Sequence, residues 1–169
     1  MDKILISIRP EWCAKICNET GKDENGKTIY EKEIEVRKSK PANVPFLAYI
    51  YETKGRYVKS IHGAHTKYAY GRGKVIGEFV CDKVENFSEW KYDYPSLLRH
   101  ICLYAATDFD FLDGYLNGEK RGYGWHISNL VIYDKPKDLI DLLGDGNGGA
   151  RPPLSWSVCK GRDREVENI

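Results

Sequence analysis

The amino-acid sequence predicts an α+β fold in which a small mixed β-barrel is flanked by short helices. The 169 residues contain several short segments in which apolar residues alternate, as expected for half-buried strands. Segments with helical spacing lie among them, but without the regular strand and helix alternation of a parallel sheet. The length suits one domain over residues 1–160, followed by a charged tail, 161–169.

The first strand is expected at residues 4–8, ILISI, where apolar residues alternate. Pro10 suits the first turn of a helix, and residues 11–20 follow at helical spacing. A polar, Gly-rich loop, TGKDENGK at 20–27, is expected to end this helix.

Three further strands are predicted in the middle of the chain, at residues 34–38, 46–53 and 74–87. Between the last two, residues 54–74 are rich in glycine and charge, which predicts an exposed excursion. Gly77 interrupts the strand that follows, and a glycine within a strand indicates a bulge or a close backbone approach.

The last third is expected to begin with short helical pieces between Leu97 and Leu116. A strand closed by proline follows at 123–136, YGWHISNLVIYDKP. Residues 138–153 read as a short helix and a Gly-rich loop, and SWSVCK at 155–160 as a final strand. The tail after it is expected to fray.

Composition and charge exclude several classes of protein. Lys and Arg number 26 against 25 Asp and Glu, so the chain lacks the global basic field of nonspecific nucleic-acid binders. Any contact with a polyanion must therefore come from a local patch. No signal-peptide pattern and no run of 18 apolar residues occur, so we expect a cytoplasmic protein without membrane contact.

No metal or cofactor is expected from the sequence motifs. The five cysteines lack a Cys-x-x-Cys pair, and their odd number favours reduced thiols over a disulfide framework. His62 and His65 are interpreted as loop residues. The glycine-rich stretches GDGNGG and YGRGK lack the spacing of a phosphate-binding loop, and standard hydrolase signatures are missing.

The stretch EKEIEVRKSKP at 31–41 places charged residues on a predicted strand. If Ile34 points to the core, Glu35 and Arg37 share the opposite face, because side chains two apart lie on one side of a strand. Lys32 joins them only if the backbone bends before Glu35. The face is then either solvated, with a weak ion pair, or a charged site.

Several motifs together resemble the ASCH domain of the PUA-like superfamily. They are SIRPEW, Lys32-x-x-Glu35-x-Arg37, YIYET, GKVIGEFVCDKV, GYGWHISNLVIYDKPKDL and RPPLSW, which span residues 3–157 in order. The ASCH signature is Gly-x-Lys-x-x-Glu-x-Arg, and here Tyr30 stands at the glycine position. The loop before the signature is also lengthened, by TGKDENGKTIY.

The resemblance implies a PUA-like β-barrel flanked by helices, with a cleft that binds RNA or a nucleotide. It assigns Lys32, Glu35 and Arg37 to the floor of this cleft, with Ser7 and Arg9 on the neighbouring strand. Arginine and lysine suit phosphate, and glutamate can accept from the exocyclic amine of a base. Further ligand contacts are expected from the YIYET motif and from two tryptophans, namely Tyr51, Thr53, Trp125 and Trp156.

The aromatic residues and the charged excursion also have structural interpretations. Trp125 and Trp156 are as readily core residues as stacking faces, and Trp12 is expected to pack in the core or under a loop. The positive charges of 54–74 are either solvated or steer a phosphate backbone toward the cleft.

Three functions remain open at this stage. The first is a module that binds RNA or a modified nucleoside. The second is a small metal-independent hydrolase acting on acetylated cytidine or on RNA, with Lys32 and either Glu35 or Glu78 as catalytic groups. Relatives with the amidohydrolase activity carry threonine where this chain has Glu35, so their mechanism does not transfer directly. The third is a protein-binding adaptor that uses Tyr57, Tyr68 and Tyr70. Oligomeric state is left open.

Overall fold

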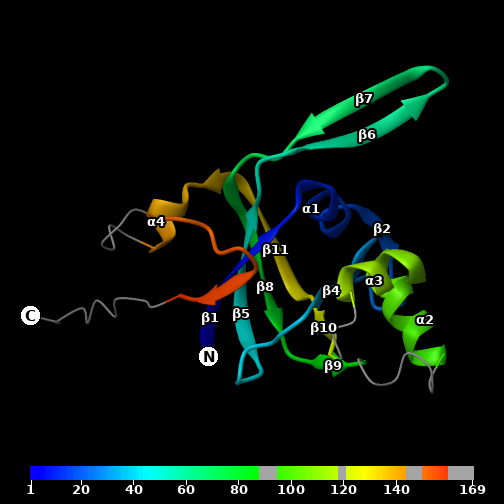
Figure 1. Ribbon diagram of the computed structural model, residues 1–169. Helices are drawn as coiled ribbons and strands as arrows, with labels where there is room; N and C mark the ends of the chain where they lie inside the picture. The colour runs from blue at the N-terminus through cyan, green and yellow to red at the C-terminus, as the bar shows by residue number, and fades with distance from the viewer. Residues whose placement is uncertain (88–94, 118–120, 144–149, 160–169) are drawn as a thin grey trace, which may run out of the picture.

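The computed structural model describes residues 1–87, 95–117, 121–143 and 150–159. Its largest sheet has five strands in the order β11-β8-β5-β1-β12 (Figure 1). These strands are β1 (Asp2–Ile8), β5 (Phe46–Glu52), β8 (Lys74–Cys81), β11 (Ser128–Lys137) and β12 (Trp156–Val158). β1 and β5 are parallel, and the other neighbours in this sheet are antiparallel.

A three-stranded antiparallel sheet, β4-β10-β9, lies beside the large one. It consists of β4 (Ile34–Arg37), β10 (Tyr123–His126) and β9 (Val84–Asn86). Two further strand pairs are hairpins, formed by β2 (Glu19–Lys22) with β3 (Thr28–Tyr30) and by β6 (Arg56–His62) with β7 (His65–Tyr70). Mixed parallel and antiparallel strands together with helices confirm the α+β class. Within the described ranges the sheets stay open, and no closed barrel forms.

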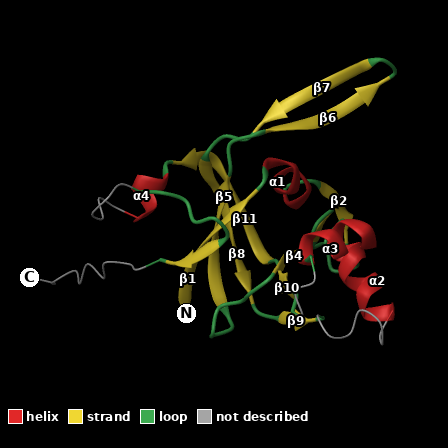
Figure 2. Ribbon diagram, viewed as in Figure 1, coloured by secondary structure: helices red, strands yellow, loops and turns green. Residues whose placement is uncertain are grey.

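In the described part of the chain, four short helices accompany the strands (Figure 2). They are α1 (Pro10–Ile16), α2 (Pro95–Tyr104), α3 (Phe109–Leu116) and α4 (Leu139–Leu143). Pro10 occupies the first turn of α1, where its missing N–H costs no helical hydrogen bond. Asp108 caps α3 by accepting a hydrogen bond from the backbone N–H of Phe111. Among the described residues, no helix has the length and apolar character that a membrane crossing requires.

The hydrophobic core divides into clusters on the two sides of β4. One cluster joins β1, α1, β5, β8 and β10, and Phe46 and Trp125 pack edge to face in it with ring centroids 4.9 Å apart. The second packs Ile34 of β4 against Phe87 and against α2 and α3. β4 therefore has α2 and α3 against its Ile34 face, while Glu35 and Arg37 face the other way.

Gly77 confirms the expected irregularity in its strand. The register between β5 and β8 shifts beside it, between Ile50 and Tyr51, and the register between β8 and β11 is irregular as well. A Cβ atom at Gly77 would lie 2.4 Å from the backbone oxygen of Val131, so β11 approaches too closely for any side chain.

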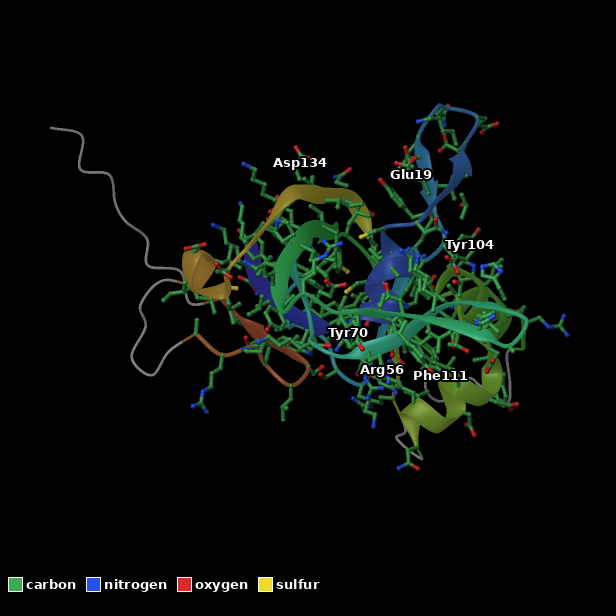
Figure 3. All side chains as sticks on the ribbon, turned by 90° about the horizontal axis from the view of Figure 1, so that it is seen from above. Glu19, Arg56, Tyr70, Tyr104, Phe111 and Asp134 are labelled. Carbon is green, nitrogen blue, oxygen red and sulfur yellow. The ribbon has the colours of Figure 1, made fainter. Side chains whose placement is uncertain are left out.

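Two predicted segments differ from the observed structure, and a third, the exposed excursion at 54–74, is confirmed as exposed but forms a hairpin. Residues 20–27, expected to be a loop, contribute to the β2–β3 hairpin. Residues 54–74 contain the β6–β7 hairpin, which projects from the sheet and carries exposed Tyr68 and Tyr70 (Figure 1). In Figure 3, Arg56 and Tyr70 lie close together where β6 begins and β7 ends, and they form one cross-strand pair. The sequence did not reveal this cross-strand pairing, because residues 54–74 lack a regular alternation of apolar and polar residues.

The strand expected at 123–136 is two strands in two different sheets, β10 and β11, separated at Ile127. Tyr57, grouped with the exposed tyrosines above, is half-buried. The GDGNGG loop at 144–149 and the tail at 161–169 lie outside the described residues.

Candidate functional site

A pocket of about 620 Å³ lies where β1, β4 and α3 meet. Five of its polar lining residues come from the signature stretch and from the end of β1, while α3 and the α2–α3 connection form the opposite wall. The residues that line it include Ser7, Arg9, Trp12, Lys32, Glu35, Arg37, Thr53, Ala105, Thr107, Asp110, Phe111, Tyr115 and Ser155.

The three signature residues form one buried ionic cluster. Arg37 Nη2 lies 2.8 Å from Glu35 Oε1, and Lys32 Nζ lies 3.2 Å from Glu35 Oε2. All three side chains are less than 10% exposed. Lys32 precedes β4, which begins only at Ile34, so the chain bends as required to bring its ammonium to Glu35.

Every donor of Lys32 has a partner within the protein. Besides Glu35, its ammonium donates to the carbonyl of Ile34 at 2.8 Å and to that of Ala105 at 3.0 Å. An ammonium group has three N–H donors, so none is left for a ligand. Lys32 therefore positions Glu35 and ties β4 to the end of α2.

Burial and charge act in opposite directions on the two ionisable partners. Burial lowers the pKa of Lys32 below its ordinary value, and the carboxylate of Glu35 offsets only part of this effect. Burial alone would raise the pKa of Glu35, but the charges of Lys32 and Arg37 hold it below the usual value. Glu35 is therefore ionised at neutral pH and is a weak base.

Arg37 is held from three sides, and its Nε–H donor stays unused. Its Nη2 donates to the carbonyl of Ser7 at 2.8 Å, and its Nη1 donates to Ser155 Oγ at 3.2 Å. Its Nε is buried and has no hydrogen-bond partner among the described residues. The hydroxyl of Thr107, across the pocket, is also buried and without a partner there.

The rim adds one free charge to this floor. Arg9 is exposed, lines the pocket and makes no ion pair within the described part of the chain. Its backbone carbonyl accepts from the N–H groups of Trp12 and Cys13, which fixes the residue at the start of α1. Counted together, the lining has three cationic side chains and two acidic ones, Glu35 and Asp110, and so carries a small positive excess.

Three aromatic side chains line the pocket, namely Trp12, Phe111 and Tyr115. The rings of Trp12 and Phe111 are 5.0 Å apart between centroids and tilted by 58°. Phe111 is 48% exposed and is labelled beside α3 in Figure 3. An exposed ring beside a half-buried one offers an apolar face to a planar ligand.

The structure brings six of the predicted site residues to this pocket: Ser7, Arg9, Lys32, Glu35, Arg37 and Thr53. The hydroxyl of Ser7 donates to the carbonyl of Pro153 at 2.6 Å, which anchors the segment that carries Ser155. Thr53 is held by a hydrogen bond from its N–H to the carbonyl of Ile8. Their placement follows from β1 and β5 running parallel to the same edge.

Four predicted residues do not line the pocket. Trp125 is fully buried in the core, because its position in β10 points it toward Phe46 rather than into the pocket. Trp156 packs against Trp125 and donates to Ser39 Oγ at 2.9 Å. Tyr51 is buried in another cluster, with Val75 and Leu139. Glu78 accepts a short hydrogen bond from the hydroxyl of Tyr133 on the large sheet.

Sequence reasoning missed the wall formed by Thr107, Phe111, Tyr115 and Ser155. These residues are 70 to 118 positions from Arg37. The first three lie in no motif, and Ser155 belongs to RPPLSW, in which only Trp156 was assigned to the site. Trp12, expected in the core or under a loop, packs against the first core cluster and also lines the pocket. The sequence offered a signal for its place at the pocket, since it lies three residues after Arg9, just beyond the end of the first strand.

Neither a family model nor a curated protein matches the chain. Solved structures do match, and three of them are of the ASCH protein of Zymomonas mobilis. The protein itself has a TM-score of 0.59 and 18% identity over 93% of this chain and 87% of that chain. Its Ser-to-Ala variant gives the same values, and its Tyr-to-Phe variant gives 0.60 and 16% over 94% and 90%. This likeness confirms the fold of the ASCH domain.

Proposed function

We propose that the pocket binds one nucleotide, either free or within single-stranded RNA. The base would stack on the aromatic residues Trp12 and Phe111, and the phosphate would lie near Arg9. A volume of about 620 Å³ falls within the range of roughly 300–1,000 Å³ that is typical of ligand sites. The resemblance to ASCH domains, which implies an RNA or nucleotide ligand, points to the same chemistry.

The observation that carries the proposal is the pair of buried polar atoms without partners. Arg37 Nε and Thr107 Oγ1 belong to opposite walls of one pocket, and neither has a hydrogen-bond partner in the described structure. Leaving such a group unsatisfied costs about 1–3 kcal/mol. A ligand that accepts a hydrogen bond from Arg37 Nε and forms another with the hydroxyl of Thr107 would recover this free energy.

The remaining lining suits a nucleotide better than a purely apolar ligand. Aromatic side chains commonly hold unpaired bases, and stacking contributes about 1–3 kcal/mol per base. Arg9 is exposed, unpaired among the described residues and long enough to follow a phosphate at the rim. The arrangement separates a stacking side, on α1 and α3, from a charged floor on β4.

The hydrolase alternative receives less support from the same geometry. The ammonium of Lys32 has no free donor, and Glu35 is doubly paired with a lowered pKa. Glu78, the other candidate base, does not line the pocket. General-base catalysis near neutral pH favours a carboxylate with a raised pKa. Binding without turnover is therefore the expected result with acetylated cytidine and with labelled RNA, and hydrolysis of either would overturn the assignment.

Replacing Arg9 by alanine should weaken binding of a labelled single-stranded RNA and make it less sensitive to salt. One lost phosphate contact should reduce the slope of log K against log salt by about 0.7. Fluorescence anisotropy over a range of salt concentrations measures both effects. Arg99→Ala, at an exposed arginine of α2 outside the pocket, is the matched control and should leave the slope unchanged. Equal slopes for the two variants would place the phosphate elsewhere.

Replacing Thr107 by valine should separate binding from stability. Valine keeps the shape of threonine but removes a buried hydroxyl without a partner, so stability should stay the same or rise. Affinity for the nucleotide should fall by about 0.5–1.5 kcal/mol, the net value of one hydrogen bond. Titrations with RNA, a mononucleotide and its unphosphorylated nucleoside locate the loss in the base or the phosphate. Unchanged affinity for all three would exclude contact with this hydroxyl.

A further inference from the structure

A second group of chemically active side chains lies outside the pocket, where α2 crosses the three-stranded sheet. It consists of Glu85 in β9, His126 at the end of β10, and His100 in α2. Glu85 Oε2 lies 3.3 Å from His126 Nε2 and 3.4 Å from His100 Nε2. All three donor atoms lie within 4.8 Å of one another.

The backbone explains why these residues meet. Gly124 pairs with Glu85 across β10 and β9, and His126 lies two residues further along the same face. A Cβ atom at Gly124 would come within 3.0 Å of Ile101 and of Ile34, so the missing side chain lets α2 pack closely on the sheet. That close approach brings His100, the neighbour of Ile101, to the carboxylate.

The contacts within the group do not satisfy its polar atoms. Glu85 Oε2 and His126 Nε2 are both buried, yet neither has a hydrogen-bond partner in the part of the chain that is described. Their 3.3 Å separation lacks the geometry of a hydrogen bond. The other carboxylate oxygen, Oε1, is already engaged by Lys83 Nζ at 3.0 Å. Two buried atoms therefore lie 3.3 Å apart without a well-aligned hydrogen bond between them.

Two of the three distances within the group match the edges of a metal site, and the third, between the two histidine nitrogens, is no longer than 4.8 Å. In a tetrahedral zinc site with ligands about 2.0–2.1 Å from the ion, neighbouring ligand atoms are about 3.3–3.4 Å apart. Glu85 Oε2 has both histidine nitrogens at such a distance. Two imidazoles and a carboxylate are a donor set that zinc accepts and that magnesium and calcium, which prefer oxygen ligands, do not.

We propose that Glu85, His100 and His126 bind one divalent transition-metal ion of the zinc class. Water completes the coordination on the open side, where the His100 side chain is 40% exposed. The ion links α2 to β9 and β10. Because α2 leads directly into Ala105, whose carbonyl accepts from Lys32, the metal also stabilises one wall of the pocket. Sequence spacing gives no sign of this site, because its ligands are 15 and 26 residues apart on three elements.

The test uses the full chain, stripped of metal by a chelator, and Zn²⁺ alone as the probe. Isothermal titration should show one equivalent bound with saturation, and the melting temperature should rise with free Zn²⁺. Mg²⁺ should produce neither effect. Co²⁺ should give the intense visible bands of a four-coordinate site without a thiolate charge-transfer band, because no cysteine takes part. Absence of saturable zinc binding, or a thiolate band, would overturn the proposal.

His100→Ala should remove a direct ligand and weaken zinc binding by more than the roughly 10–100-fold that loss of an outer partner costs. The side chain is partly exposed on α2, and circular dichroism checks that the variant remains folded. The matched control is the double variant His62→Ala, His65→Ala, which removes the other two histidines of the chain, both in the β6–β7 hairpin. Zinc affinity that survives in His100→Ala, or disappears in the hairpin variant, would contradict the assignment.

Discussion

Glu35→Gln is expected to lower the free energy of unfolding by about 3–5 kcal/mol, the cost of leaving buried charges without their partner. Glu35 is the only anion within reach of both Lys32 and Arg37 in the described structure, at 3.2 and 2.8 Å. Glutamine preserves the shape of the side chain and removes its charge. Urea denaturation followed by circular dichroism measures the difference. Glu24→Gln, at an exposed position of the β2–β3 turn, should change stability by no more than about 0.5 kcal/mol.

The difference in unfolding free energy between the parent protein and Glu35→Gln should depend on pH, with a sign that follows from the lowered pKa of Glu35. A carboxylate with a depressed folded pKa contributes its full stability above the unfolded value, 4.5, and loses it as pH falls through the lower folded value. The difference between the parent and Glu35→Gln should therefore be constant near neutral pH and narrow below about pH 4.5. A difference independent of pH would mean that the carboxylate is not held ionised by its neighbours.

Phe111→Ala should weaken binding of single-stranded RNA by about 5- to 150-fold, the equivalent of about 1–3 kcal/mol of lost base stacking. Phe111 lines the pocket with its ring against Trp12 and is 48% exposed. Fluorescence anisotropy with a labelled RNA at constant salt measures the change.

Phe109→Ala is the matched control for this prediction. Phe109 lies on the same helix, α3, and is 43% exposed, but does not line the pocket. Its loss should leave RNA affinity unchanged, while both variants lose a comparable exposed aromatic. Equal affinities for the two variants would exclude Phe111 as a stacking face.

Short-range sequence patterns were sufficient to predict the strands and helices whose residues alternate or carry a terminal signal. The alternation at 4–8 and 46–53 identified β1 and β5, and Pro10 identified the start of α1. Pairing across distance was not accessible in the same way. The apolar residues of the β6–β7 hairpin, such as the cross-strand pair Val58 and Tyr68, do not alternate regularly along the chain. The strand expected at 123–136 changes sheets at Ile127, which no periodicity marks.

In the candidate site too, residues close together in the sequence could be predicted and residues brought together by packing could not. Lys32, Glu35 and Arg37 lie within six residues, so one strand and one bend suffice to bring them together, and the sequence could predict the cluster. Thr107 and Phe111 reach the pocket only through the packing of α2 and α3 on β4. Trp125 illustrates the converse error, because an aromatic residue on a strand can face either side and here faces the core.

The most direct test of the nucleotide-binding proposal is the nuclear magnetic resonance signal of the Arg37 side-chain Nε–H during titration with a ribonucleoside monophosphate. Arg37 lines the pocket, and this donor is buried and lacks a partner among the described residues. The proposal predicts that its signal shifts and saturates with the ligand, in step with the backbone amides of Thr107 and Phe111. A signal that stays in place up to saturating nucleotide would contradict the account.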